Sequence, residues 1–539
     1  MQKEERLNEN LTFVQSGLEV LKSMDHYSYT KKDLLVALCL FLFVVMIAAC
    51  RLTAGYSVWD DDPSAYMNEG IAISEGRFWE QAEINYYYHP SQLPKEVKNN
   101  QLIYVWGYPL LLAIVNRFVE FDRVLYGSLI FYKIPNVICT GLLAGSAFLF
   151  FRRRFSAFFA VTLSLLLSLN DEFVKWVNVT APDLWLLQTG LTAFLLLECY
   201  MDILTREDSL EKGRKNRCIK PLIIAFLFGA ALWYAHELRL NGSTIALTCV
   251  MGQLVCLFRN PAARGRKKAI WHFLPYIVFS LLTWITERIL APATGNISDF
   301  SRASLAAFFR HCLKQLVAIY YFYTDLFGMV SNIHVIRVIV CILMILCAIG
   351  FLTAFKRDLH LVLFAIGSFF ITALLPYGQG IRYIFNILPI LVLCIGYGLN
   401  TLTALPVNKH GTCINTIKAA FIVLLVISSA AKQFTLVRIN LQNWREPETP
   451  VYSEDAVETY RFIQNHIPED GIIEFSYPRS LYLNTQRLSF RQDVNGHTGG
   501  EADYRLYIKS SPAENPIAGN EGNISALFEN DEFMLAKLS

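Results

Sequence analysis

Three consecutive aspartates, Asp60, Asp61 and Asp62, are the strongest sign of chemistry in the sequence. Adjacent carboxylates repel one another, so such a triplet calls for cations or a ligand close by. Because Pro63 follows, Asp62 also fits the N-cap of a helix whose first residue is Pro63. For Asp62 this capping role stands beside roles as a general base or a ligand of a hard cation. Capping does not account for Asp60 and Asp61, and all three remain catalytic candidates.

A helix that starts at Pro63 places Tyr66 on the same face as Asp62. Glu69 lies near that face too, and we expect it to be a solvated surface residue. Farther along, His89 follows a run of three tyrosines. Aromatic clusters are common at membrane interfaces, but aromatic rings also stack on sugars and a histidine moves protons near neutral pH. Tyr66 and His89 are therefore candidate substrate-binding residues.

Cationic residues lie within apolar segments or at their ends. Lys133 is inside one such segment, where a charge must face protein or water, paired with a carboxylate or bound to a substrate. Arg239 and the pair Arg382-Tyr383 stand at the ends of others, as interface anchors or as ligands. Arginine matches the geometry of phosphate well. We expect Lys133, Arg239, Arg382 and Tyr383 to bind an anionic headgroup.

Several functional classes find no support. The sequence has no GxGxxG or GxxxxGK[ST] loop, no HExxH or GxSxG motif, and no CxxC pair among its 12 cysteines. The net charge of +3 gives no reason to expect nucleic acid. Asp60 and Asp62 match the two-aspartate pattern with which many nucleotide-sugar transferases hold a metal. We expect no required cofactor and no metal site, with a divalent cation on Asp60 and Asp62 as the alternative.

The composition indicates the elements that must position these residues. The 539 residues are 54% hydrophobic and only 17% charged, whereas soluble domains carry about 25% charged residues. The apolar residues form blocks of roughly the length that a bilayer requires. We predict 11 transmembrane helices, at 34–50, 125–151, 155–170, 180–201, 220–236, 242–258, 269–290, 335–355, 359–376, 381–400 and 415–432. The apolar stretch 106–119 is shorter and is interpreted as an interfacial or re-entrant helix.

Lysine and arginine gather in one alternating set of loops, at 152–154, 203–220, 259–268 and 356–357. These loops and the N-terminus are therefore predicted to be cytoplasmic. The loop 54–106, which carries the aspartates, and the C-terminus are then external. This predicts a multi-pass membrane protein with a cytoplasmic N-terminus and with the aspartates and the C-terminal domain on the external side.

The domain organisation follows from these predictions. Residues 1–32 form a cytoplasmic segment, 33–432 a transmembrane domain and 433–539 an external α/β domain of net negative charge. In that last domain, 454–467 has helical spacing with Ser453 as N-cap. Segments 471–475 and 504–508 read as strands, and 478–483 as a helical turn.

Four motifs occur in order along the chain: Asp62 with Tyr66; Gly107-Tyr108-Pro109-Leu110-Leu111; Arg382-Tyr383 through Pro389; and Tyr477-Pro478-Arg479 through Tyr482, Thr485 and Arg487. Together they resemble the GT-C superfamily, in particular the group of dolichyl-phosphate-mannose–protein mannosyltransferases and lipid A aminoarabinose transferases. The lipid A enzymes have an acidic residue where Pro63 stands here. Their Lys-Pro pair later in the loop has no clear counterpart in this chain, although His89-Pro90 is in a comparable place. The acceptor is therefore left open as glycan, lipid or protein.

This resemblance implies a glycosyltransferase of the bacterial cytoplasmic membrane with a periplasmic active site. It would use a polyprenyl-phosphate-linked sugar on that external face, with Asp61 or Asp62 as general base. One base and a phosphate leaving group predict inversion at the anomeric carbon. Two other functions remain open. A transporter of lipid-linked glycans would move such a lipid without consuming it, and a membrane scaffold would not need the aspartates at all.

Overall fold

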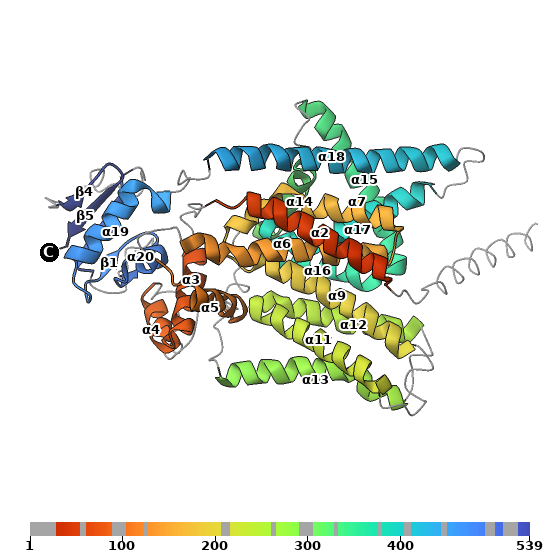
Figure 1. Cartoon of the computed structure of the whole chain (residues 1–539), viewed down its shortest axis with the longest axis horizontal. Coiled ribbons are helices and arrows are strands. Elements are labelled where there is room, and N and C mark those ends of the chain that lie inside the picture. Colours follow the sequence, from red (N-terminus) through yellow and green to blue (C-terminus); the bar gives the residue numbers. More distant parts are fainter. Residues whose placement is uncertain are drawn as a thin grey trace, which may run out of the picture.

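The computed structural model describes residues 29–53, 61–88, 104–122, 128–205, 216–259, 266–289, 305–327, 332–374, 380–403, 411–443, 450–490, 502–509 and 526–538. Most of these residues are helical. A bundle of long helices carries a small β-sheet unit at one end, with three short helices beside it (Figure 1).

Seven helical segments of the described chain are long and apolar enough to cross a membrane. They are found in α2 (Lys31–Cys50), α6 (Leu129–Arg152), α9 (Asp183–Thr205), α11 (Asn216–Leu238), α15 (Ile333–Arg357), η7 (Gly380–Ile387) continued by α17 (Leu388–Thr403), and α18 (Gly411–Asn443). An eighth candidate bends by 54° between α7 (Ala157–Ser168) and α8 (Asp171–Val174) with η3 (Lys175–Asn178). The chain is thus a multi-pass membrane protein.

The remaining bundle elements are α12 (Ser243–Arg259), α13 (Arg266–Ile289), α14 (Leu305–Thr324), α16 (Leu359–Ala373) and the short η4 (Leu240–Gly242). Each of the 11 predicted apolar blocks coincides with a helix, but the span count of 11 remains a prediction. Helix α14 was not predicted, because Arg310, His311 and Lys314 interrupt its apolar run. Its buried His311 ring lies 3.3 Å from the carbonyl oxygen of Ala373 at the end of α16. Helix α14 therefore packs on the bundle through one side, while Phe309, Leu313 and Tyr321 are exposed on it.

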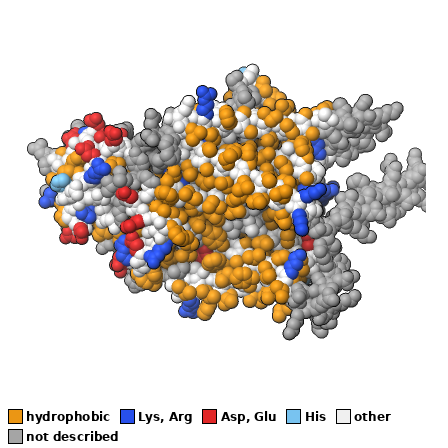
Figure 2. All heavy atoms as spheres, in the orientation of Figure 1, with side chains coloured by type: hydrophobic (Ala, Val, Ile, Leu, Met, Phe, Trp, Pro, Cys, Tyr) orange, Lys and Arg blue, Asp and Glu red, His pale blue; other side chains and the backbone are white. Residues whose placement is uncertain are grey.

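The outer surface of the bundle is apolar where lipid would contact it. In Figure 2 hydrophobic side chains cover the middle of the visible face, and charged side chains gather toward its two ends. We call one of these the basic end, defined by Arg152, Arg153, Arg154, Lys356 and Arg357. The opposite end, next to the β-sheet unit, is the sheet end.

Buried ion pairs hold the helices together at the basic end. Arg154, in the turn after α6, lies 2.7 Å from Asp358 and also pairs with Glu198. Arg153 lies 2.8 Å from Glu198 and 2.7 Å from Asp202. Since these carboxylates come from α9 and the start of α16, the pairs fix the ends of three helices relative to one another.

The C-terminal unit is a five-stranded sheet in the order β2-β1-β3-β5-β4, packed with two helices. Its elements are η8 (Pro450–Tyr452), α19 (Glu454–His466), β1 (Ile473–Glu474), α20 (Pro478–Thr485), β2 (Ser489–Phe490), β3 (Tyr504–Ile508), β4 (Ala526–Glu529) and β5 (Phe533–Lys537). Strand β1 pairs in parallel with β2 and β3, and β5 is antiparallel to β3 and β4. The predicted α19 with its Ser453 cap, the strands β1 and β3, and the helical turn at α20 are confirmed. Strands β2, β4 and β5 were not predicted.

Helices α3 (Asp61–Ser74), α4 (Phe78–Tyr88) and α5 (Gly107–Phe118) lie at the sheet end, next to the sheet unit (Figure 1). The 12-residue α5 occupies the stretch predicted to be too short to span. A Cβ atom on Gly107 would lie 2.6 Å from the carbonyl oxygen of Glu237, so only glycine lets α5 start directly against the end of α11. This contact fixes α5, and α3 packed on it, beside Arg239, which follows α11.

Candidate active site

Asp62 lies in the first turn of α3, which begins at Asp61. The predicted cap arrangement, with Asp62 as N-cap and Pro63 as first helical residue, is therefore wrong, because the helix starts two residues earlier. A first-turn carboxylate is favoured by the helix dipole. The hydroxyl of Tyr104 donates a hydrogen bond to Oδ1 of Asp62 at 2.5 Å. The position of the Asp62 side chain is therefore explained by its side-chain partners and not by a capping role.

Two guanidinium groups face the Asp62 carboxylate from distant parts of the chain. Nη2 of Arg382, in η7, lies 3.4 Å from Oδ2, and Nη1 of Arg479, in α20, lies 3.6 Å from Oδ1. The Asp62 side chain is 28% exposed, but those of Arg382 and Arg479 are only 10% and 7% exposed. A carboxylate that solvent reaches is therefore backed by two largely buried cations.

The docking of α20 on α3 positions Arg479. The hydroxyls of Ser64 and Ser480 share a hydrogen bond of 2.7 Å, and Nδ2 of Asn68 donates to the carbonyl oxygen of Arg479 at 3.0 Å. The Arg479 guanidinium also donates to the Tyr104 hydroxyl at 3.1 Å. Since Ser64, Asn68 and Ser480 are all buried, this contact places a C-terminal side chain in the site with little freedom to move.

A second ion pair lies beside the first. Nη2 of Arg239 is 3.1 Å from Oδ2 of Asp183, which is 3% exposed at the start of α9. The ring of Tyr383 links the two pairs, since its centroid is 5.6 Å from the Arg239 guanidinium and 5.5 Å from that of Arg382. Both distances are typical of cation–π contacts. Three arginines and two aspartates therefore form one continuous cluster, which we call the Asp62 cluster: Asp62, Asp183, Arg239, Arg382 and Arg479.

Tyrosines pack behind this cluster. The Tyr66 ring centroid is 4.3 Å from that of Tyr104 and 5.4 Å from that of Tyr108. Tyr66 is only 2% exposed. It supports Tyr104, and through it Asp62, and offers almost no surface to a substrate.

The charges of the cluster set the protonation state of Asp62. Burial raises the pKa of its carboxyl, but the Tyr104 hydrogen bond and the charges of Arg479, Arg382 and Arg239 lower it more. The net result is an Asp62 pKa below the ordinary value. Burial also raises the pKa of the Tyr104 hydroxyl, which stays protonated and able to donate. Asp62 is therefore a carboxylate at neutral pH.

The structure does not bring every predicted residue to this cluster. Lys133 is fully buried in the second turn of α6, where its Nζ donates to the carbonyl oxygen of Thr53 at 3.0 Å. For Asp61 the structure gives the helix position alone. Asp60 and His89 lie outside the described residues. Glu69 is fully buried and accepts a hydrogen bond from Asn85 at 3.0 Å, so the expectation of a solvated surface residue is wrong.

Metal ligands do not gather within the described ranges: no group of three or more His, Cys, Asp or Glu residues there is arranged to hold an ion. Asp60 is not among those residues. The alternative of a cation on Asp60 and Asp62 therefore stays a prediction.

Three members of the site were not among the predicted site residues: Tyr104, Asp183 and Arg479. Asp183 had a signal, because an ionisable residue at the start of an apolar segment is a candidate for a functional role. Arg479 stood in the tail motif Tyr477-Pro478-Arg479 without an assigned role. Tyr104 gave no signal, since a tyrosine near a membrane interface is ordinary.

No protein-family model matches the chain, and no curated protein matches it. Solved structures do match its fold. ArnT from Cupriavidus metallidurans bound to undecaprenyl phosphate superposes with a TM-score of 0.54 at 10% identity, over 93% of this chain and 97% of ArnT. ArnT in the apo state superposes with a TM-score of 0.53 at 12% identity, over 93% of this chain and 97% of ArnT. The Archaeoglobus fulgidus oligosaccharyltransferase in complex with Zn and sulfate gives 0.53 at 12% identity, over 89% of this chain and 70% of that one.

The fold is thus that of a polytopic membrane protein with a C-terminal α/β unit. More narrowly, it is the GT-C fold, which ArnT and the archaeal oligosaccharyltransferase share. This agrees with the family that the ordered motifs resemble.

Proposed function

We propose that this protein is a membrane glycosyltransferase that moves a sugar from a polyprenyl-phosphate-linked donor to an acceptor hydroxyl, with Asp62 as general base. The observation that carries the proposal is the placement of Arg382 and Arg479 within 4 Å of the Asp62 carboxylate. A base and a phosphate-binding pair of arginines then lie side by side. The polyprenyl phosphate bound in ArnT, a protein of the same fold, supports a donor of this class.

The reaction needs one base and one anion site. The acceptor oxygen attacks the anomeric carbon of the donor, and the bond from that carbon to the phosphate oxygen breaks. Asp62 takes the proton of the acceptor hydroxyl, and polyprenyl phosphate leaves with its negative charge on the arginines. A single displacement of this kind inverts the anomeric centre.

The arginines also explain how a carboxylate with a lowered pKa serves as base. In the free protein they face Asp62 and hold it ionised. A donor phosphate competes for the same guanidinium groups, because charge-assisted pairs with phosphate are strong. As they turn toward the phosphate, Asp62 loses counter-charge and its affinity for a proton rises. Donor binding would thus turn a neutralised carboxylate into a working base.

No cofactor is required by this scheme, because guanidinium groups neutralise the leaving phosphate where other transferases use a divalent cation. We place the sheet end on the external side of the bacterial cytoplasmic membrane and the basic end in the cytoplasm, which the distribution of lysine and arginine supports. The acceptor is a glycan, lipid or protein on the external side.

The test compares two lipids that differ only in the phosphate. Purified protein in detergent is titrated with undecaprenyl phosphate and with undecaprenol, and binding is followed by native mass spectrometry. We expect tighter binding of the phosphate by about tenfold or more, the effect of one charge-assisted contact. Equal binding of the two lipids would contradict a phosphate-linked donor.

A further inference from the structure

A second polar pocket lies at the basic end, across the bundle from the Asp62 cluster. It has a volume of about 480 Å³ and lies between the end of α6, the first turn of α7, the end of α17 and the start of α18. None of the residues that line it belongs to the Asp62 cluster. The pocket therefore calls for a separate account.

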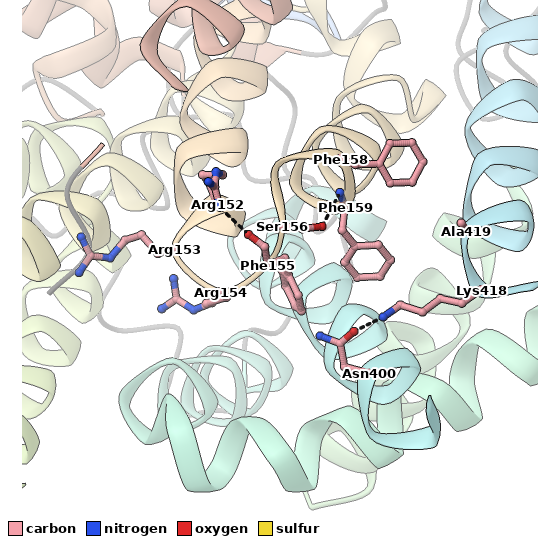
Figure 3. A pocket seen from close by; sticks show the side chains of 10 residues that line it. All are labelled: Arg152, Arg153, Arg154, Phe155, Ser156, Phe158, Phe159, Asn400, Lys418 and Ala419. Carbon is pink, nitrogen blue, oxygen red and sulfur yellow. Dashed lines mark hydrogen bonds between the residues drawn. The ribbon is translucent and has the colours of Figure 1, made fainter. Parts of the chain in front are cut away.

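Most of the arginines around this pocket are already neutralised. Arg153 and Arg154 pair with Glu198, Asp202 and Asp358 as described above, and Nε of Arg152 lies 2.8 Å from Asp33. Figure 3 shows the side chains of Arg153 and Arg154 pointing away from Lys418. The three arginines line the pocket, and their carboxylate partners lie outside its lining.

Lys418 is different, because its contacts are with neutral groups. Its Nζ donates to the side-chain oxygen of Asn400 and lies 4.5 Å from the ring centroid of Phe159. It makes no ion pair with a carboxylate anywhere in the described part of the chain. Lys418 reaches across the pocket from α18 (Figure 3). Its charge is therefore available to an anion that enters.

The first turn of α7 supplies backbone donors at the same place. Ser156 caps this 12-residue helix by accepting from the N–H of Phe159. The N–H groups of Ala157 and Phe158 precede the first intrahelical bond, which Ala160 makes to Ser156. Such a helix start together with a cation is a favourable site for a phosphate group.

Exposed apolar side chains lie next to the polar lining of the pocket. Phe158, which lines the pocket from α7, is 54% exposed, and Ile417, the residue before Lys418 on α18, is 62% exposed. Exposed apolar side chains on membrane helices face acyl chains. A phosphate group attached to an acyl chain should therefore bind here more tightly than a free phosphate ion.

We propose that this pocket binds the phosphate headgroup of an anionic phospholipid, with Lys418 and the first turn of α7 as ligands and its acyl chains along Phe158 and Ile417. Basic pockets between helices at the cytoplasmic side of membrane proteins hold headgroups of this kind. The proposal does not depend on the glycosyltransferase reaction.

The experiment measures lipid retention by native mass spectrometry of the full-length protein, purified with phosphatidylglycerol or phosphatidylcholine. We expect retained phosphatidylglycerol on the wild type and a loss of about tenfold in Lys418→Gln, in line with one charge-assisted contact. Lys418→Arg keeps the cation and should retain the lipid, which separates loss of charge from misfolding. Lys356→Gln removes a lysine from an exposed position at the basic end outside the pocket and should match the wild type.

Three results would overturn the proposal. The first is equal retention of phosphatidylglycerol by wild type and Lys418→Gln. The second is equal retention of phosphatidylglycerol and phosphatidylcholine by the wild type. The third is displacement of the lipid by millimolar inorganic phosphate with the same dependence on Lys418, because this would assign the pocket to a soluble anion.

Discussion

Arg479, in the C-terminal unit, lies 3.6 Å from the carboxylate of Asp62 at the start of α3. The site is therefore completed by two segments from opposite ends of the chain. Because Asn68 holds the Arg479 backbone and Tyr104 touches both charged groups, the C-terminal unit is part of the chemistry in this account.

Replacing either arginine should weaken transfer without unfolding the protein. For Arg479→Gln and for Arg382→Gln we expect kcat/KM for the lipid donor to fall about 10- to 100-fold, the effect of losing one charge-assisted phosphate contact. Arg461→Gln is the matched control, because Arg461 is exposed on α19 in the same C-terminal unit as Arg479. Initial rates at several donor concentrations measure the effect. An unchanged kcat/KM in both Arg479→Gln and Arg382→Gln would contradict a role of these arginines in binding the donor phosphate.

The lowered pKa of Asp62 predicts the acid side of the pH profile. The pKa of Asp62 in the folded protein lies below the ordinary value of about 3.9. The ionised Asp62 therefore stabilises the fold at pH values above about 3.9, and this stabilisation is lost as the pH falls through the lower pKa of the folded state. The free enzyme should therefore keep its kcat/KM as the pH falls from about 7 to about 5. In Arg479→Gln, which loses a charge that lowers the pKa, the acid limb should move to higher pH. A wild-type acid limb near pH 6 that does not respond to Arg479→Gln would contradict this assignment.

The pair of Asp183 and Arg239 should contribute to stability as well as to the site. Asp183→Asn leaves Arg239 as a largely buried cation without its carboxylate, and breaking such a pair costs about 3 kcal/mol. We expect a lower thermal midpoint in detergent. The double variant Asp183→Asn/Arg239→Gln removes both charges and should recover part of that loss. Additive losses in the double variant would mean that the two side chains do not interact.

The close approach at Gly107 gives a prediction about packing. In Gly107→Ala the new Cβ meets the backbone of Glu237 and Leu238 at 2.6 to 2.9 Å, so α5 has to shift against α11. Both the thermal midpoint and the transfer rate should fall, because this contact lies next to Arg239. Gly367→Ala in α16 is the control, since a Cβ there meets nothing within 4 Å. Equal effects of the two substitutions would show that the contact is not restrictive.

Much of this architecture could be predicted from apolar patterning. Each predicted apolar block coincides with a helix, because burial in lipid or in the protein core stabilises long apolar helices. Helix α14 was not predicted because the exposed Arg310 and Lys314 and the buried His311 interrupt its apolar run, and the apolar pattern alone does not separate such a helix from a loop. The start of α3 was misplaced by two residues because Pro63 tolerates several positions in a first helical turn.

The site itself was predictable only in part. Asp62, Arg239, Arg382 and Tyr383 were named from residue type and position, and the structure brings them together. Arg479 was not assigned to the site, because its position depends on how α20 docks on α3. The spacing of residues within a segment does not predict a contact between distant segments. Lys133 was a reasonable candidate from its burial, but its contact with the Thr53 backbone ties α6 to the chain after α2.

In the proposed reaction Asp62 drives the consumption of a polyprenyl-phosphate-linked sugar. The most direct measurement is lipid mass spectrometry of membranes that carry wild type, Asp62→Asn or the exposed control Asp470→Asn at matched protein level. We expect the lipid-linked sugar to accumulate with Asp62→Asn alone, since removing a general base costs about 10²- to 10⁴-fold in rate. The mass of the accumulated lipid would identify the sugar. Identical lipid pools in all three membranes, with folded protein in each, would contradict the account.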